Sequence, residues 1–211
     1  MTQIATNAPF WARPPAVALI VLAYALAHGL LRWVASDTIG IDEANETVLV
    51  QSLEWGYVVR QPPLYDWLLW AIHRWTGPGI GSTLLLKYAA LCGTCLFLHR
   101  IARRLSPDLR IAALAAFSPV ALYQIGWNYH EGVTHTAILS TAVAGSILAL
   151  MRFAEAPKPG RAAALGLAIG LGLLCKHSYY AALAQMAVAA LAVAPVRRRL
   201  ASPWLLLSAA L

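Results

Sequence analysis

The feature that most constrains this chain is a succession of long apolar runs separated by short polar segments. An α-helix rises 1.5 Å per residue, so about 20 apolar residues cross a hydrocarbon core of ~30 Å. Runs of this kind predict membrane spans at 15–35, 80–98, 111–125, 133–151, 162–175 and 179–194, with the start of a seventh at 203–211. The sequence therefore predicts an all-α polytopic membrane protein in which residues 1–211 form a single transmembrane domain.

Composition supports a membrane protein and argues against a nucleic-acid partner. Only 12% of the residues are charged and 60% are hydrophobic, whereas roughly a quarter of the residues in soluble domains are charged. A net charge of +7 would suggest nucleic acid in a soluble protein, but here the basic residues stand in short clusters between apolar runs. That distribution is typical of cytoplasmic loops. Because the last apolar run continues to residue 211, we also expect the N-terminal part of a longer protein.

The charge distribution predicts the topology. Eleven of the sixteen Lys and Arg residues fall on one set of segments, which are residue 13 and the stretches 99–110, 152–161 and 195–202. Basic loops face the cytoplasm, so we expect a multi-pass protein of the inner (plasma) membrane with its N-terminus inside. Seven of the nine carboxylates fall on the opposite segments, 36–79 and 126–132. Topology does not explain why the carboxylates gather on the predicted outer segments, because acidic residues contribute little to the charge rule.

The loop 36–79 is the one long polar and aromatic interval in the chain. It opens with a predicted helix from Asp42, whose apolar positions Ala44, Val48, Leu49 and Leu53 share one face, and Gly56 ends that helix. A second helix is predicted over 64–75; it is too short to span and rich in tryptophan. Both helices should lie in the membrane interface, and we place the chemistry in this loop.

Several motifs in this loop and beyond it carry a family resemblance. They are Asp42-Glu43, Trp55-Gly56-Tyr57, the run Pro62-Pro63-Leu64-Tyr65-Asp66-Trp67, and the segment 170–180 with Lys176 at its centre. Their order resembles glycosyltransferase family 39, which is similar to the protein mannosyltransferases and the lipid A aminoarabinose transferases of the GT-C superfamily. The resemblance covers nearly the whole chain. It departs from the family pattern at Gln61, where many relatives have histidine, and at 175–177, where Cys-Lys-His replaces Ser-Lys-Tyr.

The resemblance implies transfer of a sugar from a polyprenyl-phosphate carrier to a lipid, glycan or protein acceptor on the periplasmic face. A hydroxyl acceptor is a poor nucleophile until a base takes its proton, so Asp42 is the candidate base and Glu43 its support. Cations stabilise the charge that develops on the leaving phosphate. The candidate substrate-binding residues are Arg60, Gln61, Pro62, Tyr65, Asp66, His135 and Lys176.

Other interpretations of the same residues remain open. Asp42 and Glu43 also suit an ordinary solvated helix start, where acids favour the dipole, and Arg60 and Lys176 also suit anchoring to lipid headgroups. At the level of function, the alternatives are a transporter or flippase and a non-catalytic membrane assembly subunit. Transporters place essential polar groups at mid-membrane in repeated halves. Here the acids collect in the first outer loop and no internal repeat is visible, which favours the enzyme.

Two further features concern buried charge and metal. Lys87 lies about two turns inside the predicted span 80–98, where a charge is costly without a partner. His130, Glu131 and His135 are suitable ligands for a divalent ion, but their spacing does not place all three on one helical face. The sequence therefore establishes no cofactor and leaves a divalent metal ion open.

Overall fold

The computed structural model describes residues 8–210, and this range consists of helices joined by loops, with one isolated antiparallel bridge between Val58 and Gln61. The predicted all-α class is confirmed. Residues 1–7 and 211 lie outside the described residues, so the predicted seventh span is described only up to residue 210.

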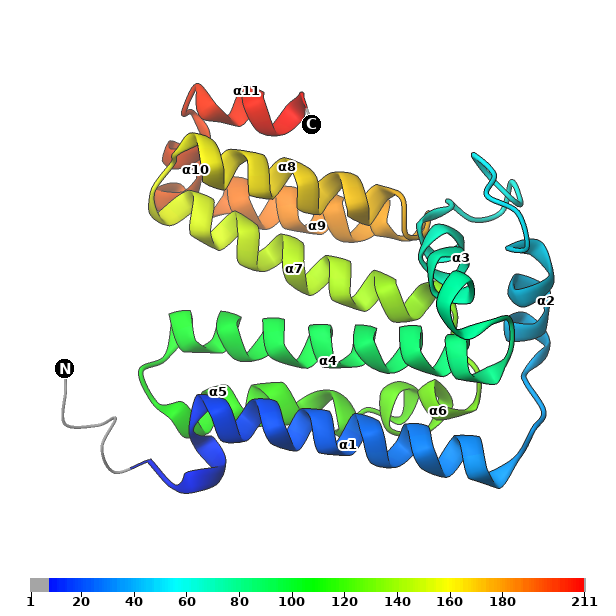
Figure 1. Cartoon of the computed structure of the whole chain (residues 1–211). Coiled ribbons are helices and arrows are strands. Elements are labelled where there is room, and N and C mark those ends of the chain that lie inside the picture. Colours follow the sequence, from blue (N-terminus) through cyan, green and yellow to red (C-terminus); the bar gives the residue numbers. More distant parts are fainter. Residues whose placement is uncertain (1–7, 211) are drawn as a thin grey trace.

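Among the described residues, three helices are long and apolar enough to cross a membrane: α1 (Pro14–Ala35), α4 (Ile80–Leu105) and α7 (His135–Glu155). A short 3-10 helix, η1 (Phe10–Ala12), precedes α1. The central helix is α4, which packs against α1, α5 (Leu109–Phe117) and α7. Figure 1 shows α1 and α5 on one side of α4 and α7 on the other. The predicted span 80–98 is longer than expected, because the helix continues through the basic cluster to Leu105.

The third predicted span bends. After α5 the chain forms a 3-10 turn, η2 (Ser118–Ala121), then a π-helical turn, η3 (Gln124–Asn128), and the short α6 (Tyr129–Glu131), with a bend of 70° between the two halves. Pro119 cannot donate a backbone hydrogen bond, and a Cβ on Gly126 would lie 2.2 Å from the carbonyl oxygen of Val120. The predicted outer loop 126–132 is therefore mostly helical, because these residues turn the chain back.

The last helices are shorter. Helix α8 (Pro159–Leu173) has 15 residues, about 22 Å at the usual rise, and packs between α7 and α11 (Trp204–Ala209). Helix α9 (Tyr179–Ala192) continues into α10 (Ala194–Leu200) through a bend of 106°. Counting each bent pair as one span, the described residues hold five candidate spans, and α8 is a shorter apolar helix beside them.

Two helices of the long polar loop cap one end of the bundle (Figure 1). They are α2 (Ile41–Leu49) and α3 (Leu64–Thr76). The predicted helix 64–75 is confirmed, and it ends at Gly77, whose φ of 76° suits glycine. The first helix ends at Leu49, so the predicted end at Gly56 is wrong and Leu53 lies beyond the helix. Val48 is 67% exposed, whereas Glu43 and Glu46 are buried. Helix α2 thus turns these two carboxylates towards the bundle.

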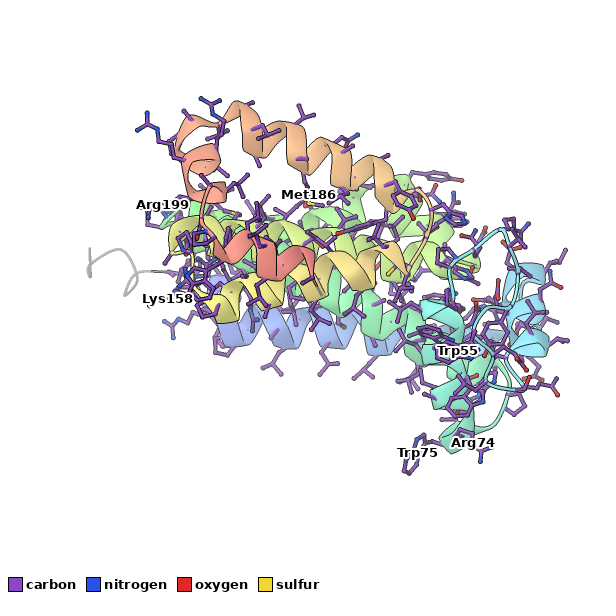
Figure 2. All side chains as sticks on the ribbon, turned by 90° about the horizontal axis from the view of Figure 1, so that it is seen from above. Trp55, Arg74, Trp75, Lys158, Met186 and Arg199 are labelled. Carbon is purple, nitrogen blue, oxygen red and sulfur yellow. The ribbon has the colours of Figure 1, made fainter. Side chains whose placement is uncertain are left out.

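Charged and aromatic residues divide between the two ends of the bundle. In Figure 2, Trp55, Arg74 and Trp75 lie at the end that carries α2 and α3, and Lys158 and Arg199 lie at the opposite end. We call these the α2–α3 end and the basic end. The turn between α8 and α9 also lies at the α2–α3 end (Figure 1). The segments that the sequence assigns to one side of the membrane thus gather at one end of the bundle.

Candidate functional site

A buried ion pair fastens α2 to the central helix. Glu43 Oε1 lies 2.6 Å from Lys87 Nζ, and both side chains are almost completely buried. The other carboxylate oxygen, Glu43 Oε2, accepts the backbone N–H of Gly40 at 3.2 Å, which caps the start of α2. Tyr129 donates its hydroxyl to the carbonyl oxygen of Lys87 at 2.8 Å. Lys87 thus has the oppositely charged partner that a lysine within a predicted span requires. The ion pair with Glu43 holds α2 against α4.

A second polar cluster lies one turn further along α2. Glu46 Oε1 is 3.7 Å from His135 Nδ1, and Asp66 Oδ2 is 3.7 Å from His135 Nε2. We call Glu46, Asp66 and His135 the acid–histidine triad; its members come from α2, α3 and the first residue of α7. Their exposed fractions are 5%, 0% and 2%. The ring of Tyr65, also buried, packs 4.9 Å from the imidazole.

The surroundings of the triad favour the neutral form of Glu46. Burial, then the neighbouring carboxylate of Asp66, raises the pKa of Glu46 to about 8, although the charge of Arg60 acts in the opposite direction. Two carboxylates that share a buried site cannot both ionise without a compensating charge. The cluster therefore needs a proton or a cation.

Asp42 does not join these buried groups. It lies in the first turn of α2 beside Glu43, but its side chain is exposed while that of Glu43 points into the bundle. Successive residues of a helix point about 100° apart, which is why these two neighbouring carboxylates diverge. The structure thus presents Asp42 to solvent on a helix that its neighbours Glu43 and Glu46 hold in place.

The loop before α3 meets the turn after α8. Leu64 N donates to the carbonyl oxygen of Leu174 at 3.0 Å, and His177 Nε2 lies 3.4 Å from the carbonyl oxygen of Val59. Lys176 Nζ donates to Thr136 Oγ1 at 2.8 Å. Since Arg60 follows Val59 and Lys176 precedes His177, the two predicted phosphate-binding segments are brought side by side.

The other predicted substrate-binding residues lie in the same loop. Arg60 is exposed, and Pro62 is half-buried. Gln61 donates its backbone N–H to the carbonyl oxygen of Val58 at 3.3 Å, and its side-chain Oε1 is buried without a hydrogen-bond partner. Nearby, the indole of Trp67 donates to the carbonyl oxygen of Glu54 at 2.8 Å. The departure from the family pattern at Gln61 therefore falls inside the site.

An apolar cavity of about 320 Å³ leads away from this region into the bundle. Its lining comes from α3, α4, α7 and α8, and includes Leu64, Leu68, Ile138, Leu171 and Cys175. Lys176, a candidate phosphate-binding residue, directly follows Cys175 in the chain.

The sequence-based metal hypothesis for His130, Glu131 and His135 is not supported. The hydroxyls of Tyr24 and Tyr88 hydrogen bond to the two ring nitrogens of His130, each at 2.8 Å. Glu131 is exposed, and His135 lies in the triad. Within residues 8–210, the one group of three acidic, histidine or cysteine side chains that could hold a metal ion is the acid–histidine triad.

Sequence reasoning missed two residues as members of the site, Glu46 and Lys87. A charged residue within a span signals a buried partner, so Lys87 could have been assigned to the site. Glu46 follows Glu43 by three residues, which places both on the same helix face. The pairing of each with a particular side chain came only from the packing of α2, α3 and α7 on α4.

The chain is similar in sequence to known proteins. The chain is 31% identical over 191 residues to lipopolysaccharide core galacturonosyltransferase RgtA of Rhizobium johnstonii, covering 90% of this chain and 38% of that protein. It is 27% identical over 181 residues to lipopolysaccharide core galacturonosyltransferase RgtB of the same organism, covering 86% of this chain and 36% of that protein. The chain thus spans less than two fifths of the length of these curated relatives.

No solved structure is significantly similar to the chain. Residues 60–211 match the family described as dolichyl-phosphate-mannose-protein mannosyltransferase, a stretch that begins at the candidate phosphate-binding loop and includes α3, Lys87, His135 and Lys176. Helix α2 precedes the matched stretch, and both named relatives align over most of the chain. On this match, the chain belongs to the dolichyl-phosphate-mannose-protein mannosyltransferase family.

Proposed function

We propose that this chain forms part of a membrane glycosyltransferase that moves a sugar from a polyprenyl-phosphate carrier to a lipid, glycan or protein acceptor. The observation that carries the proposal is the placement of Asp42: an exposed carboxylate on a helix anchored through buried Glu43 and Glu46. A base must be held at a defined position to take a proton in the transition state. Family membership supports the reaction class.

In the proposed reaction, the acceptor hydroxyl gives its proton to Asp42 as its oxygen attacks C1 of the sugar. The bond between C1 and the phosphate oxygen breaks, and the polyprenyl phosphate leaves with the electron pair. Arg60 and Lys176 are the cations proposed to stabilise that leaving phosphate, since their segments lie side by side. The apolar cavity beside Cys175 suits the start of the prenyl chain.

The relatives suggest which substrates to test first. Both are named as galacturonosyltransferases of the lipopolysaccharide core, so we propose a polyprenyl-phosphate galacturonic acid donor and a lipopolysaccharide core acceptor as the first pair. Donors carrying neutral sugars form the comparison panel. The donor carboxylate would add a second negative charge near Arg60 and Lys176.

The decisive experiment replaces Asp42 in the full-length protein and measures transfer in membranes. Asp42→Asn preserves size but removes basicity, so we expect the rate to fall about a hundred- to ten-thousandfold with donor binding retained. The matched control is Asp37→Asn, which neutralises another exposed acid just before α2 and should transfer at the parental rate. Transfer by the Asp42→Asn protein within a few-fold of the parent would reject Asp42 as the base.

We also propose that the α2–α3 end faces the periplasm and that the N-terminus faces the cytoplasm of the inner membrane. The basic end carries most of the Lys and Arg residues, and such segments stay on the cytoplasmic side. Single cysteines at Ser36 and Ser106, in a background without the native three, should differ in labelling by an impermeant reagent on intact cells. Labelling at Ser106 but not at Ser36 would invert the proposed topology.

A further inference from the structure

The acid–histidine triad contains buried polar atoms that have no partner in the described residues. These are Glu46 Oε2, both carboxylate oxygens of Asp66, and His135 Nε2. His135 lies 3.7 Å from the nearest oxygen of each carboxylate, beyond the 2.7 to 3.2 Å of a hydrogen bond. Buried polar groups are almost always satisfied, so these atoms need something that they share.

The separations suit a shared metal ion better than a direct contact. Ligand atoms at 2.0–2.2 Å from a tetrahedral Zn²⁺ lie about 3.3–3.6 Å from one another. One ligand atom from each residue lies within 4.8 Å of the others. The two 3.7 Å distances involve different ring nitrogens of His135, so a bound ion would use one nitrogen and draw the other carboxylate closer. Small rotations of the side chains would close the set around one ion.

The charges point to a divalent cation. Two ionised carboxylates carry a charge of −2, and the nearby buried lysine, Lys87, is already paired with Glu43. An ion of charge +2 would neutralise the cluster without protonating a carboxylate. An imidazole ligand favours zinc and similar transition metals over magnesium and calcium, which prefer oxygen ligands alone.

We propose that Glu46, Asp66 and His135 bind one divalent transition-metal ion, with Zn²⁺ the best match. The three ligands come from α2, α3 and α7, so the ion would tie both helices of the polar loop to the bundle. Tyr65 packs against the imidazole and would keep its ring oriented. Three protein ligands leave one coordination position for water.

The ion has a consequence for Asp42 that rests on the proposed function. Asp42 precedes Glu46 by about one helical turn on α2, so fixing Glu46 also fixes the position of the candidate base. Loss of the metal should therefore reduce transfer without changing the chemical groups that perform it. Metal binding itself is measured without any sugar donor, so the two proposals can fail separately.

The test is the metal content and metal affinity of the purified full-length protein. Expressed with zinc, the protein should retain about one Zn²⁺ per chain after dialysis. After treatment with a chelator it should take up Zn²⁺ again, and Co²⁺ should give the visible spectrum of nitrogen and oxygen ligands. All measurements use a background in which Cys92, Cys95 and Cys175 are replaced, which removes thiol ligands.

Variants then assign the ligands. Glu46→Gln, Asp66→Asn and His135→Gln should each weaken Zn²⁺ binding by at least about a hundredfold, since even a residue that only orients a ligand typically contributes 10- to 100-fold. Glu131→Gln and His177→Gln are the matched controls, because both side chains are exposed, and they should bind like the parent. Far-ultraviolet circular dichroism and gel filtration check that each variant folds.

Two results would overturn the proposal. One is a chelator-treated parent protein that takes up none of Zn²⁺, Co²⁺ and Mn²⁺, which does not depend on any variant folding. The other is unchanged Zn²⁺ affinity in folded Asp66→Asn and His135→Gln proteins. A preference for Mn²⁺ over Zn²⁺ that is lost in the same variants supports the site and corrects the identity of its metal.

Discussion

Replacing Lys87 by methionine isolates the ion pair that anchors α2. At 2.6 Å, two unit charges attract by about 6 kcal/mol at an effective dielectric of 20, before desolvation is subtracted. Removing one partner leaves a buried carboxylate, which typically costs about 3–5 kcal/mol. The carboxylate can limit that cost by taking up a proton, which at pH 7 requires about 4 kcal/mol because glutamate ordinarily ionises near pH 4.3.

These magnitudes predict both the size and the pH dependence of the effect. Lys87→Met should lower the free energy of unfolding at pH 7 by about 3–4 kcal/mol. In the variant, protonation of the buried carboxylate removes the unpaired charge. The loss of unfolding free energy relative to the parent should therefore decrease by about 1.4 kcal/mol per pH unit from pH 7 towards pH 5. The sign follows from proton binding: the folded variant holds a proton that its unfolded chain releases, so its stability relative to the parent rises as the pH falls.

The assay is reversible unfolding in mixed detergent micelles, followed by circular dichroism. The double variant Glu43→Gln with Lys87→Met removes both charges and should recover most of the lost stability, since no unpaired charge remains. The difference between the single and double variants gives the coupling between the two side chains. A Lys87→Met protein as stable as the parent at pH 7, or a double variant no more stable than the single one, would refute the buried-pair reasoning.

Two further predictions concern donor binding and helix packing. Arg60→Gln and Lys176→Gln should each weaken binding of a polyprenyl-phosphate donor by roughly ten- to a hundredfold, as expected for one charge-assisted contact of about 1.5–3 kcal/mol. Arg74→Gln, which removes an exposed cation at the end of α3, should leave donor binding unchanged. Equal donor affinity in all three variants would show that Arg60 and Lys176 are lipid anchors. Gly172→Ala would place a Cβ 2.1 Å from an aromatic ring of α9 and should destabilise the protein by about 1–3 kcal/mol. Gly160→Ala meets open space and should unfold like the parent in the same micelle titration; equal losses in both would show that the close contact at Gly172 relaxes freely.

The sequence by itself predicted most of the helices, although the central helix continues through the basic cluster to Leu105 and the predicted outer loop 126–132 is mostly helical. In lipid, backbone groups must be satisfied within the segment, so a long apolar run becomes a helix whatever its neighbours are. The helix α3 was predicted for a similarly local reason, since Pro62-Pro63 precedes it and Gly77 follows. The order of short motifs also sufficed to indicate the family, which the match over residues 60–211 confirms.

Only the tertiary structure decided which polar groups meet. Periodicity marks the apolar face of an isolated helix, but for α2 it gave no indication that Glu43 would meet Lys87 or that Glu46 would meet His135. Such pairs depend on how helices far apart in the sequence are rotated and stacked, and no local pattern encodes that. For the same reason, no sequence pattern indicated that His130 hydrogen bonds to two tyrosines instead of joining a metal site. Polar groups buried in a membrane bundle bind whatever partner the packing brings within reach, because leaving them unpaired costs more than any local preference supplies.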